Sequence, residues 1–260
     1  MTTISGVRAR FLRIFSIQNP RNLHYSPHRA FPRTLIGTFS VISKMEQSSA
    51  VSNGGGLSAA RVSTISNGGE DNHRAVQFQL SPTGVLKFQQ GDITQWSVDG
   101  SSDAIVNPAN EQMLGGGGAD GAIHRAAGRE LRAACYNVPE VQPGLRCPTG
   151  EARITPGFRL PATHVIHTVG PIYFAHQNPE AALRSAYRNC LRIAKENNIQ
   201  YIAFTAISCG VYGYPYDEAA TVAITAIQEF ANDFKEVHIV LFSDDIYNVW
   251  LDKAKELLQN

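Results

Sequence analysis

Residues 104–125 read AIVNPANEQMLGGGGADGAIHR, and they are the most informative part of the chain. The apolar run at 104–106 predicts a strand, and the residues after Gly118 predict a helix that begins near Ala119. The glycines between them lack Cβ atoms, so this backbone can take positive φ and bring its N–H groups close to a ligand. We therefore predict an anion-binding loop, assisted by the amides and the dipole at the start of the helix.

Four polar side chains in this stretch have the chemistry of a ribose and phosphate site. Asp120 and His124 are four positions apart, which places them on one face of the expected helix. Asn107 and Asn110 offer amide donors and acceptors suited to sugar hydroxyls. In the simpler interpretation the loop is an ordinary turn, Asp120 is a first-turn acid and His124 is a structural histidine.

The glycines do not form the familiar nucleotide motifs. Gly116, Gly118 and Gly121 satisfy the G-x-G-x-x-G spacing, but residues 108–114 separate them from the strand, and no second strand ends in an acid about 20 residues further on. The G-K-[ST] of a phosphate-binding P-loop does not occur either. We therefore expect neither a dinucleotide-binding fold nor a P-loop.

From Ala75 onward, short apolar runs alternate with helical patterns. The expected strands are 76–80, 85–89, 104–107, 164–169, 201–207 and 237–242, and the helical patterns cover 183–194, 220–234 and 247–258. This alternation predicts an α/β fold in which a mostly parallel sheet lies between helical layers. Such sheets bind ligands in the loops at the carboxyl ends of their strands.

A second loop of this kind follows the expected strand at 201–207. It contains Ser208, Cys209, Gly210, Val211 and Tyr212 and precedes a helix predicted near Tyr216. Two anion-binding loops at one edge of a sheet would suit a diphosphate. Cys209 suggests a nucleophile, but no histidine lies near it in the sequence, so we favour a small packed residue. Asp92 suits two roles equally, as a helix cap with Thr94 or as an acceptor from an exocyclic amine.

The first 45 residues contain seven Lys and Arg and no Asp or Glu. An Arg-rich, Ser-containing, acid-free segment is typical of an organelle transit peptide, so we expect a chloroplast or mitochondrial location. The alternatives are a basic tail, and a cytoplasmic or nuclear protein that starts at Met45. Residues 46–74, rich in Gly, Ser and Asn, predict a flexible linker, and the folded domain is expected over 75–260.

The charge of the remaining chain restricts its partners. Without the seven cations of residues 1–45, the chain has 16 Lys and Arg and 22 Asp and Glu, a formal charge of −6. We therefore expect no bulk binding of nucleic acid. No apolar run reaches the ~20 residues of a membrane span, and no membrane partner is expected. Cys135, Cys147, Cys190 and Cys209 lack the spacing of a zinc site or a disulfide framework. His164 and His167 are interpreted as structural, and no metal is expected.

Several ordered motifs resemble those of macrodomains of the MacroD-type hydrolase class, the Appr-1-p processing family. They are GDIT at 91–94, DAIVN at 103–107 with Asn110, GGGGADGAIHRAAG at 115–128, TGEA at 149–152, HTVGP at 167–171 and GVYGYP at 210–215. The resemblance covers roughly residues 75–258. It implies a three-layer α/β/α sandwich around a six-stranded mixed, mostly parallel sheet, with ADP-ribose in a cleft.

The resemblance also implies a role for each matching residue. Asp92 and Ile93 would contact adenine, and Phe242 would stack on it. Asn110 would contact the distal ribose and, with Asp120 and His124, belong to the catalytic residues. Asn107 is expected to bind the ligand beside them. The diphosphate would lie between two loops, which are Gly116, Gly117 and Gly118 on one side and Ser208, Cys209, Gly210, Val211 and Tyr212 on the other.

We therefore expect a hydrolase that removes mono-ADP-ribose from acidic side chains of proteins, or deacetylates O-acetyl-ADP-ribose, by attack of a water and without a metal or cofactor. Asp120 would deprotonate the water. The expected partners are ADP-ribose, its esters and mono-ADP-ribosylated proteins, and the chain is expected to be a monomer. The alternative is a reader that binds ADP-ribose without turnover, and the presence of both Asp120 and His124 favours the enzyme.

Overall fold

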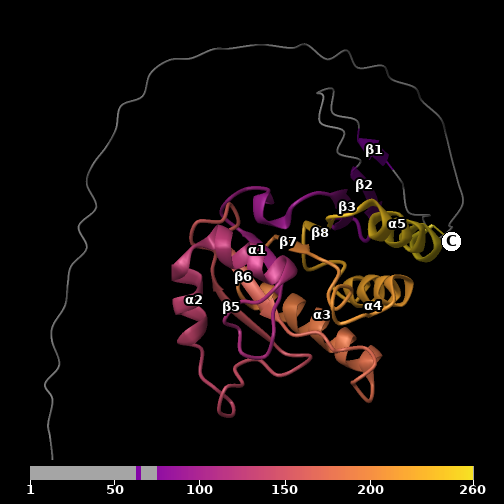
Figure 1. The fold of residues 1–260 in the computed structure, drawn as a ribbon. Helices are drawn as coiled ribbons and strands as arrows, with labels where there is room; N and C mark the ends of the chain where they lie inside the picture. Colours follow the sequence, from indigo (N-terminus) through magenta and orange to yellow (C-terminus); the bar gives the residue numbers. More distant parts are fainter. Residues whose placement is uncertain (1–62, 66–74, 260) are drawn as a thin grey trace, which may run out of the picture. The chain divides into compact units, whose positions relative to one another are not determined.

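The computed structural model describes residues 63–65 and 75–259, and Figure 1 shows their helices and strands. The expected basic segment at 1–45 lies outside the described residues. So does the expected linker at 46–74, except for residues 63–65. Among the described residues, every helix is too short or too polar to cross a membrane.

Among the residues that the structure describes, eight strands form one sheet in the order β1-β2-β3-β8-β7-β4-β6-β5. They are β1 (Ser63–Ile65), β2 (Ala75–Gln79), β3 (Val85–Gln90), β4 (Asp103–Pro108), β5 (Ala152–Pro156), β6 (His164–Thr168), β7 (Tyr201–Phe204) and β8 (Glu236–Leu241). The five strands from β3 to β6 in this order pair in parallel, whereas β1, β2 and β5 pair antiparallel at the edges. The predicted mixed, mostly parallel sheet is confirmed.

The number of strands differs from the six expected, because two edge strands were not predicted. β1 has only three residues and lies within the segment expected as a linker. β5 contains Arg153 and Pro156 and has no apolar run. An edge strand pairs on one side only and tolerates polar residues and proline, so hydrophobic periodicity gives little sign of it.

Five α-helices and one short 3-10 helix accompany the sheet in the described part of the chain. They are η1 (Ile93–Gln95), α1 (Gly118–Ala127), α2 (Arg129–Tyr136), α3 (Pro179–Glu196), α4 (Tyr216–Gln228) and α5 (Asp244–Leu258). α1 begins one residue from the predicted start. The helical pattern at 220–234 ends as a helix at Gln228, and the strand expected at 201–207 ends at Phe204.

Two separate hydrophobic clusters show that the sheet is covered on both faces. Ala104 and Val106 of β4 pack with α3, α4 and α5, whereas Ile105 between them packs with α1 and α2. Successive side chains of a strand point to opposite faces, so β4 contributes to both cores. The helices separate in the same way in Figure 1, with α1 and α2 apart from the group α3, α4 and α5. The predicted three-layer arrangement is confirmed.

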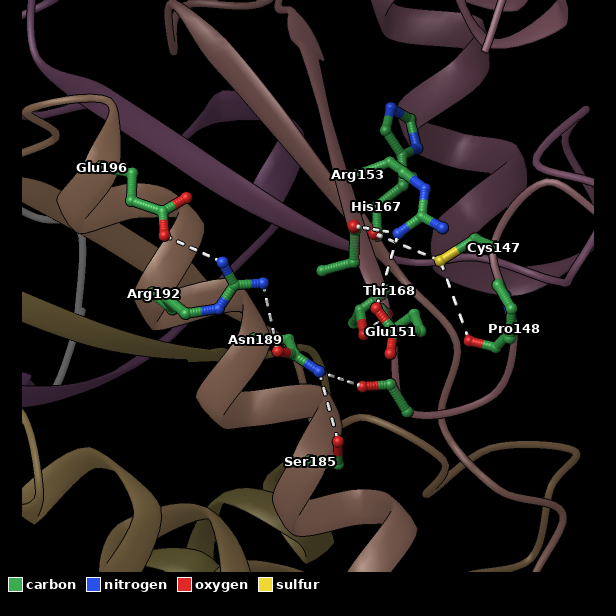
Figure 2. A network of polar contacts seen from close by, with 12 residues as sticks. Cys147, Pro148, Glu151, Arg153, His167, Thr168, Ser185, Asn189, Arg192 and Glu196 are labelled. Carbon is green, nitrogen blue, oxygen red and sulfur yellow. Dashed lines mark hydrogen bonds and ion pairs between the residues drawn. The ribbon is translucent and has the colours of Figure 1, made fainter. Parts of the chain in front are cut away.

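A polar network fastens the loop before β5 to β6 and α3 (Figure 2). Thr168 Oγ1 donates to the carbonyl of Glu151 at 2.7 Å, and Asn189 Nδ2 donates to the carbonyl of Gly150 at 2.7 Å. Cys147 Sγ lies 4.0 Å from the carbonyl oxygen of His167. These contacts satisfy backbone groups of the loop and hold it against β6, the strand that carries His167.

Candidate functional site

A cleft lies at the carboxyl ends of the parallel strands, where the fold class predicts it. One cavity of ≈ 410 Å³ lies beside the ends of β3 and β8, and another of ≈ 400 Å³ lies beside the ends of β4 and β6. Both cavities are lined by Gly118, Ala119, Thr205, Ala206 and Gly210, so they are two halves of one cleft. An elongated ligand with two different ends fits such a shape.

The glycine loop forms one wall of this cleft at the start of α1. Gly116, Gly117 and Gly118 line the cavity, and Gly118 has a φ of 57° that favours glycine. A Cβ on Gly121, in the first turn of α1, would lie 2.4 Å from the carbonyl oxygen of Gly116. The loop therefore packs directly on the helix and presents exposed backbone beside its amino end, as an anion site requires.

Asp120 is buried at the base of the glycine loop and has two oxygens in different environments. Oδ1 accepts a hydrogen bond of 2.8 Å from Nδ2 of Asn107. Oδ2 is buried and has no hydrogen-bond partner among the described residues. A Cβ built on Gly116 would lie 2.9 Å from this Oδ2 and 3.2 Å from Asn110 Nδ2, so both groups face the glycine loop that lines the cavity. One oxygen is anchored, and the other is available for chemistry.

Asn107 does not lie where a ligand contact was expected. Its side chain is fully buried, and it lies outside the residues that line either half of the cleft. Nδ2 instead contacts Asp120 and, at 3.0 Å, Nδ1 of His167. Asn107 therefore lies outside the cleft in this structure, because its strand position directs its side chain toward Asp120 and His167 rather than into the cavity. Asn110, three residues later, does line the cavity, and its amide also donates to the Gly115 carbonyl.

His124 lies next to Asp120, as the spacing predicted. Its Nε2 is 3.4 Å from Asp120 Oδ1, and its side chain is 10% exposed. Burial is the main influence on both groups: it raises the pKa of Asp120 and lowers the pKa of His124. Because desolvation disfavours both charged forms, His124 is neutral near pH 7 and the carboxylate is a stronger base than an exposed aspartate.

The second predicted loop forms the opposite wall. Ser208, Gly210, Val211 and Tyr212 line the same half of the cleft as Asp120, and Cys209 lines the other half. Ser208 has a φ of 66°, which is uncommon for a residue with a side chain and typical of functional loops. Burial raises the pKa of the Cys209 thiol to about 12, which agrees with a packed residue rather than a nucleophile.

The other half of the cleft contains the residues expected to bind a base. Asp92, Ile93 and Phe242 all line it, and Phe242 is 83% exposed. Asp92 also caps η1, because its Oδ1 accepts from the Thr94 amide at 2.9 Å. The capping role is thus present, and the exposed carboxylate remains beside the cavity.

Thr205 and Gly170 are among the lining residues that were not predicted. Thr205 belongs to both halves of the cleft, and its buried Oγ1 has no partner among the described residues. Gly170 follows β6, and a Cβ there would lie 2.1 Å from Ser208 Oγ. Their position just beyond the ends of β7 and β6 is the signal that would have found them, because the topology directs those ends to the same edge.

A cluster of residues whose side chains can bind metals lies behind the site. His124, Cys135 and His167 each place a nitrogen or sulfur within 4.8 Å of the others. Nδ1 and Nε2 of His167 are at hydrogen-bonding distance from Asn107 and Thr155, and burial raises the pKa of the Cys135 thiol to about 12. Both ring nitrogens of His167 are thus engaged by protein groups, so we assign His167 to a polar core.

Comparisons with known proteins agree with this geometry. Residues 106–223 match the Macro domain family. A Macro domain-containing protein of Xanthomonas campestris is 54% identical over 159 residues, which are 60% of this chain and 86% of the relative. A Salmonella typhimurium protein named O-acetyl-ADP-ribose deacetylase is 48% identical over 167 residues, 63% of this chain and 90% of the relative. The solved structure of an Oceanobacillus iheyensis macrodomain with ADP has a TM-score of 0.67 at 41% identity, and the match covers 72% of this chain and 98% of that chain.

The fold and the cleft define an α/β protein of the ligand-binding class, with two glycine-containing loops at the carboxyl edge of a mixed sheet. The 54% identity to the Xanthomonas protein, over 86% of that relative, then identifies the family. The chain belongs to the macrodomain family.

Proposed function

We propose that the chain hydrolyses esters of ADP-ribose. The substrates are proteins that carry mono-ADP-ribose on acidic side chains, O-acetyl-ADP-ribose, or both. The observation that carries this proposal is the asymmetric environment of Asp120, whose Oδ1 is held by Asn107 while the buried Oδ2 faces the glycine loop. The name of the Salmonella relative and the ADP of the Oceanobacillus structure support the same ligand class.

The two halves of the cleft suit the two ends of ADP-ribose. Adenine would lie beside Asp92, Ile93 and Phe242, where a carboxylate can accept from an exocyclic amine and a ring can stack. The diphosphate would lie between the glycine loop and the loop at 208–212, next to the amides at the start of α1. The distal ribose would then lie beside Asn110 and Asp120.

Asp120 would act as the general base. Its Oδ2 would take a proton from a water whose oxygen attacks the acyl carbonyl of the ester or, where the ester is on the anomeric carbon, that carbon with the carboxylate as leaving group. Both routes give the free carboxylic acid and ADP-ribose. The raised pKa of Asp120 strengthens it as a base, and general-base catalysis contributes typically about 10²–10⁴-fold. Neutral His124 would support the carboxylate, and backbone amides of the glycine loop would stabilise the developing charge.

The proposal is tested with the full chain by two measurements on the same sample. Calorimetry with ADP-ribose reports the occupancy of the cleft, and release of acetate from O-acetyl-ADP-ribose or of ADP-ribose from a glutamyl-modified protein reports turnover. Binding together with release supports the hydrolase. Binding without release from either substrate would identify a reader, and the absence of binding would reject the ligand class.

A further inference from the structure

A line of buried polar groups continues from Asp120 into the core, beyond the residues that face the cleft. Asn107 Nδ2 is 2.8 Å from Asp120 Oδ1 and 3.0 Å from His167 Nδ1. On its other side, His167 Nε2 is 3.0 Å from Thr155 Oγ1 and 3.6 Å from Cys135 Sγ. Asn107 of β4 and His167 of β6 are direct partners in the parallel register, so the sheet itself sets their distance. The side chains of Asn107 and His167 are fully buried.

The hydrogens in this line can be placed by counting donors and acceptors. The Asn107 amide has two N–H donors, and its two Nδ2 contacts are the Asp120 carboxylate and an imidazole nitrogen. His167 Nδ1 must therefore accept, which leaves its single hydrogen on Nε2, directed at Thr155. Burial lowers the pKa of His167 to about 3, so the ring stays neutral over the working pH range.

This arrangement allows Asn107 only one amide orientation. A flipped amide would place Oδ1 against the Asp120 carboxylate and against the lone pair of His167 Nδ1, and the buried pair would lose two hydrogen bonds. The Asp120 carboxylate opposes the flip, the imidazole acceptor adds to this preference, and the amide keeps Asp120 Oδ1 occupied. The side chain of Asp120 is in turn held in the rotation that directs Oδ2 toward Gly116.

We propose that His167 is a positioning residue for the hydrolysis, acting through Asn107 to hold Asp120 with Oδ2 toward the ester. This inference rests on the proposed function of Asp120. It assigns a role in turnover to a side chain that lines neither half of the cleft. From the sequence, His167 was interpreted as structural.

Other titratable and charged groups face Asp120, and the test leaves them in place. His124 approaches from α1, Cys135 from α2 and Tyr212 from the loop after β7. Arg132 of α2 acts on His124 by its charge. None of these four residues is changed in the variants below. A difference in kcat or in the Asp120 pKa between the variants therefore reports on the contacts of His167.

Two substitutions of matched chemistry separate the positioning role from general support of the core. His167→Asn places an amide oxygen near the position of Nδ1 and keeps an acceptor for Asn107. His167→Gln places its amide near the position of Nε2 and removes the acceptor at Nδ1. Both variants are neutral and polar, and both disturb the packing. His167→Asn keeps the acceptor for Asn107 and loses the group near Thr155, whereas His167→Gln keeps a group near Thr155 and loses the acceptor.

Three quantities are measured on the full chain: kcat, the Kd for ADP-ribose, and the pKa of the Asp120 carboxyl from the ¹³Cγ signal, which Asp120→Asn assigns. In His167→Gln we expect kcat to fall by about 10- to 100-fold, the order for one lost hydrogen bond at a charged group. The Asp120 pKa should rise and the Kd should stay within about threefold of wild type. His167→Asn should recover most of kcat and return the pKa toward the wild-type value.

Equal kcat and equal Asp120 pKa in the two variants would overturn the positioning role, because packing alone would then explain any loss. If wild type does not hydrolyse either ester, the proposed function fails. The Asp120 pKa still decides whether His167 acts through Asn107, because that measurement needs no turnover.

Thr155→Val serves if neither His167 variant folds, because it removes the Nε2 partner with little change of volume. It should lower kcat and raise the Asp120 pKa in the same direction but less, and wild-type values of both would overturn the proposal.

Discussion

Asn107 and Asp120 are joined by a hydrogen bond of 2.8 Å between Nδ2 and Oδ1, although one ends a strand of the sheet and the other lies in the first turn of α1. The bond uses one carboxylate oxygen and leaves Oδ2 directed toward Gly116 beside Asn110. It links the sheet, which is rigid, to the group proposed to activate water. Preorganisation of this kind costs no rearrangement when the reaction occurs.

Gly116 and Gly117 should respond differently to the same added methyl group. In Gly116→Ala the Cβ would meet Asp120 Oδ2 at 2.9 Å, so we expect kcat to fall by about 10²-fold through displacement of the carboxylate. In Gly117→Ala the Cβ meets no protein atom within 4 Å, so only the approach of the ligand changes and KM should rise. Steady-state kinetics of both variants on O-acetyl-ADP-ribose make the comparison. Equal losses of kcat would contradict this account of the loop.

Phe242 is expected to stack on adenine. Its ring lines the half of the cleft that contains Asp92 and is 83% exposed, with a face available to a ligand. Phe242→Ala should weaken ADP-ribose binding by about 1–3 kcal/mol, roughly 5- to 150-fold, as measured by calorimetry. Phe158→Ala is the matched control, because Phe158 is a half-exposed phenylalanine in the turn after β5, outside the cleft. An unchanged Kd in Phe242→Ala would remove the stacking assignment.

The dependence of kcat on pH should reflect the burial of Asp120. Its pKa is raised above the ordinary 3.8, so kcat should fall on the acid side with an apparent pKa higher than that of an exposed aspartate. The Asn107 hydrogen bond lowers the pKa of Asp120. Asn107→Ala should therefore move the acid limb to still higher pH and lower kcat. A limb that does not move would show that a different group controls the reaction.

The same burial predicts a cost in stability. A carboxyl whose pKa is raised by folding stabilises the folded state while it is protonated, and this contribution is lost as pH rises through the folded pKa. Asp120→Asn keeps the shape without the charge, so its Tm should exceed that of wild type at pH 7. The difference should shrink as the pH falls toward 3.8. Thermal scans at several pH values measure this, and a lower Tm for Asp120→Asn at pH 7 would contradict a desolvated carboxylate.

Much of this architecture could be predicted from local patterns. The central strands contribute apolar side chains to both faces of the sheet. The glycines before α1 indicate both a loop and the start of a helix. β1 and β5 could not be found in this way, because they are short or polar and pair at edges. α2 was missed as well, since only Leu131 and Cys135 of its eight residues are buried and its apolar face is narrow.

The candidate site, too, could be predicted only in part from the sequence. Asp120, His124, Asn110 and both loops lie together as predicted, because each follows a strand that ends at one edge of the sheet. The position of Asn107 could not be derived from spacing. Whether a side chain at a strand end faces the cavity or the core depends on the helix packed above it. His167 acquires its role in the same way, from the cross-strand register with Asn107.

The most direct test is the release of ADP-ribose by the full chain from a protein carrying mono-ADP-ribose on glutamate, measured beside Asp120→Ala. Asp252→Ala, an exposed acid on α5, is the control for loss of a carboxylate elsewhere. The account predicts release by wild type and by the control, a loss of about 10²–10⁴-fold in Asp120→Ala, and ADP-ribose binding in all three. Wild-type rates in Asp120→Ala, or no release by a wild-type chain that binds ADP-ribose, would contradict it.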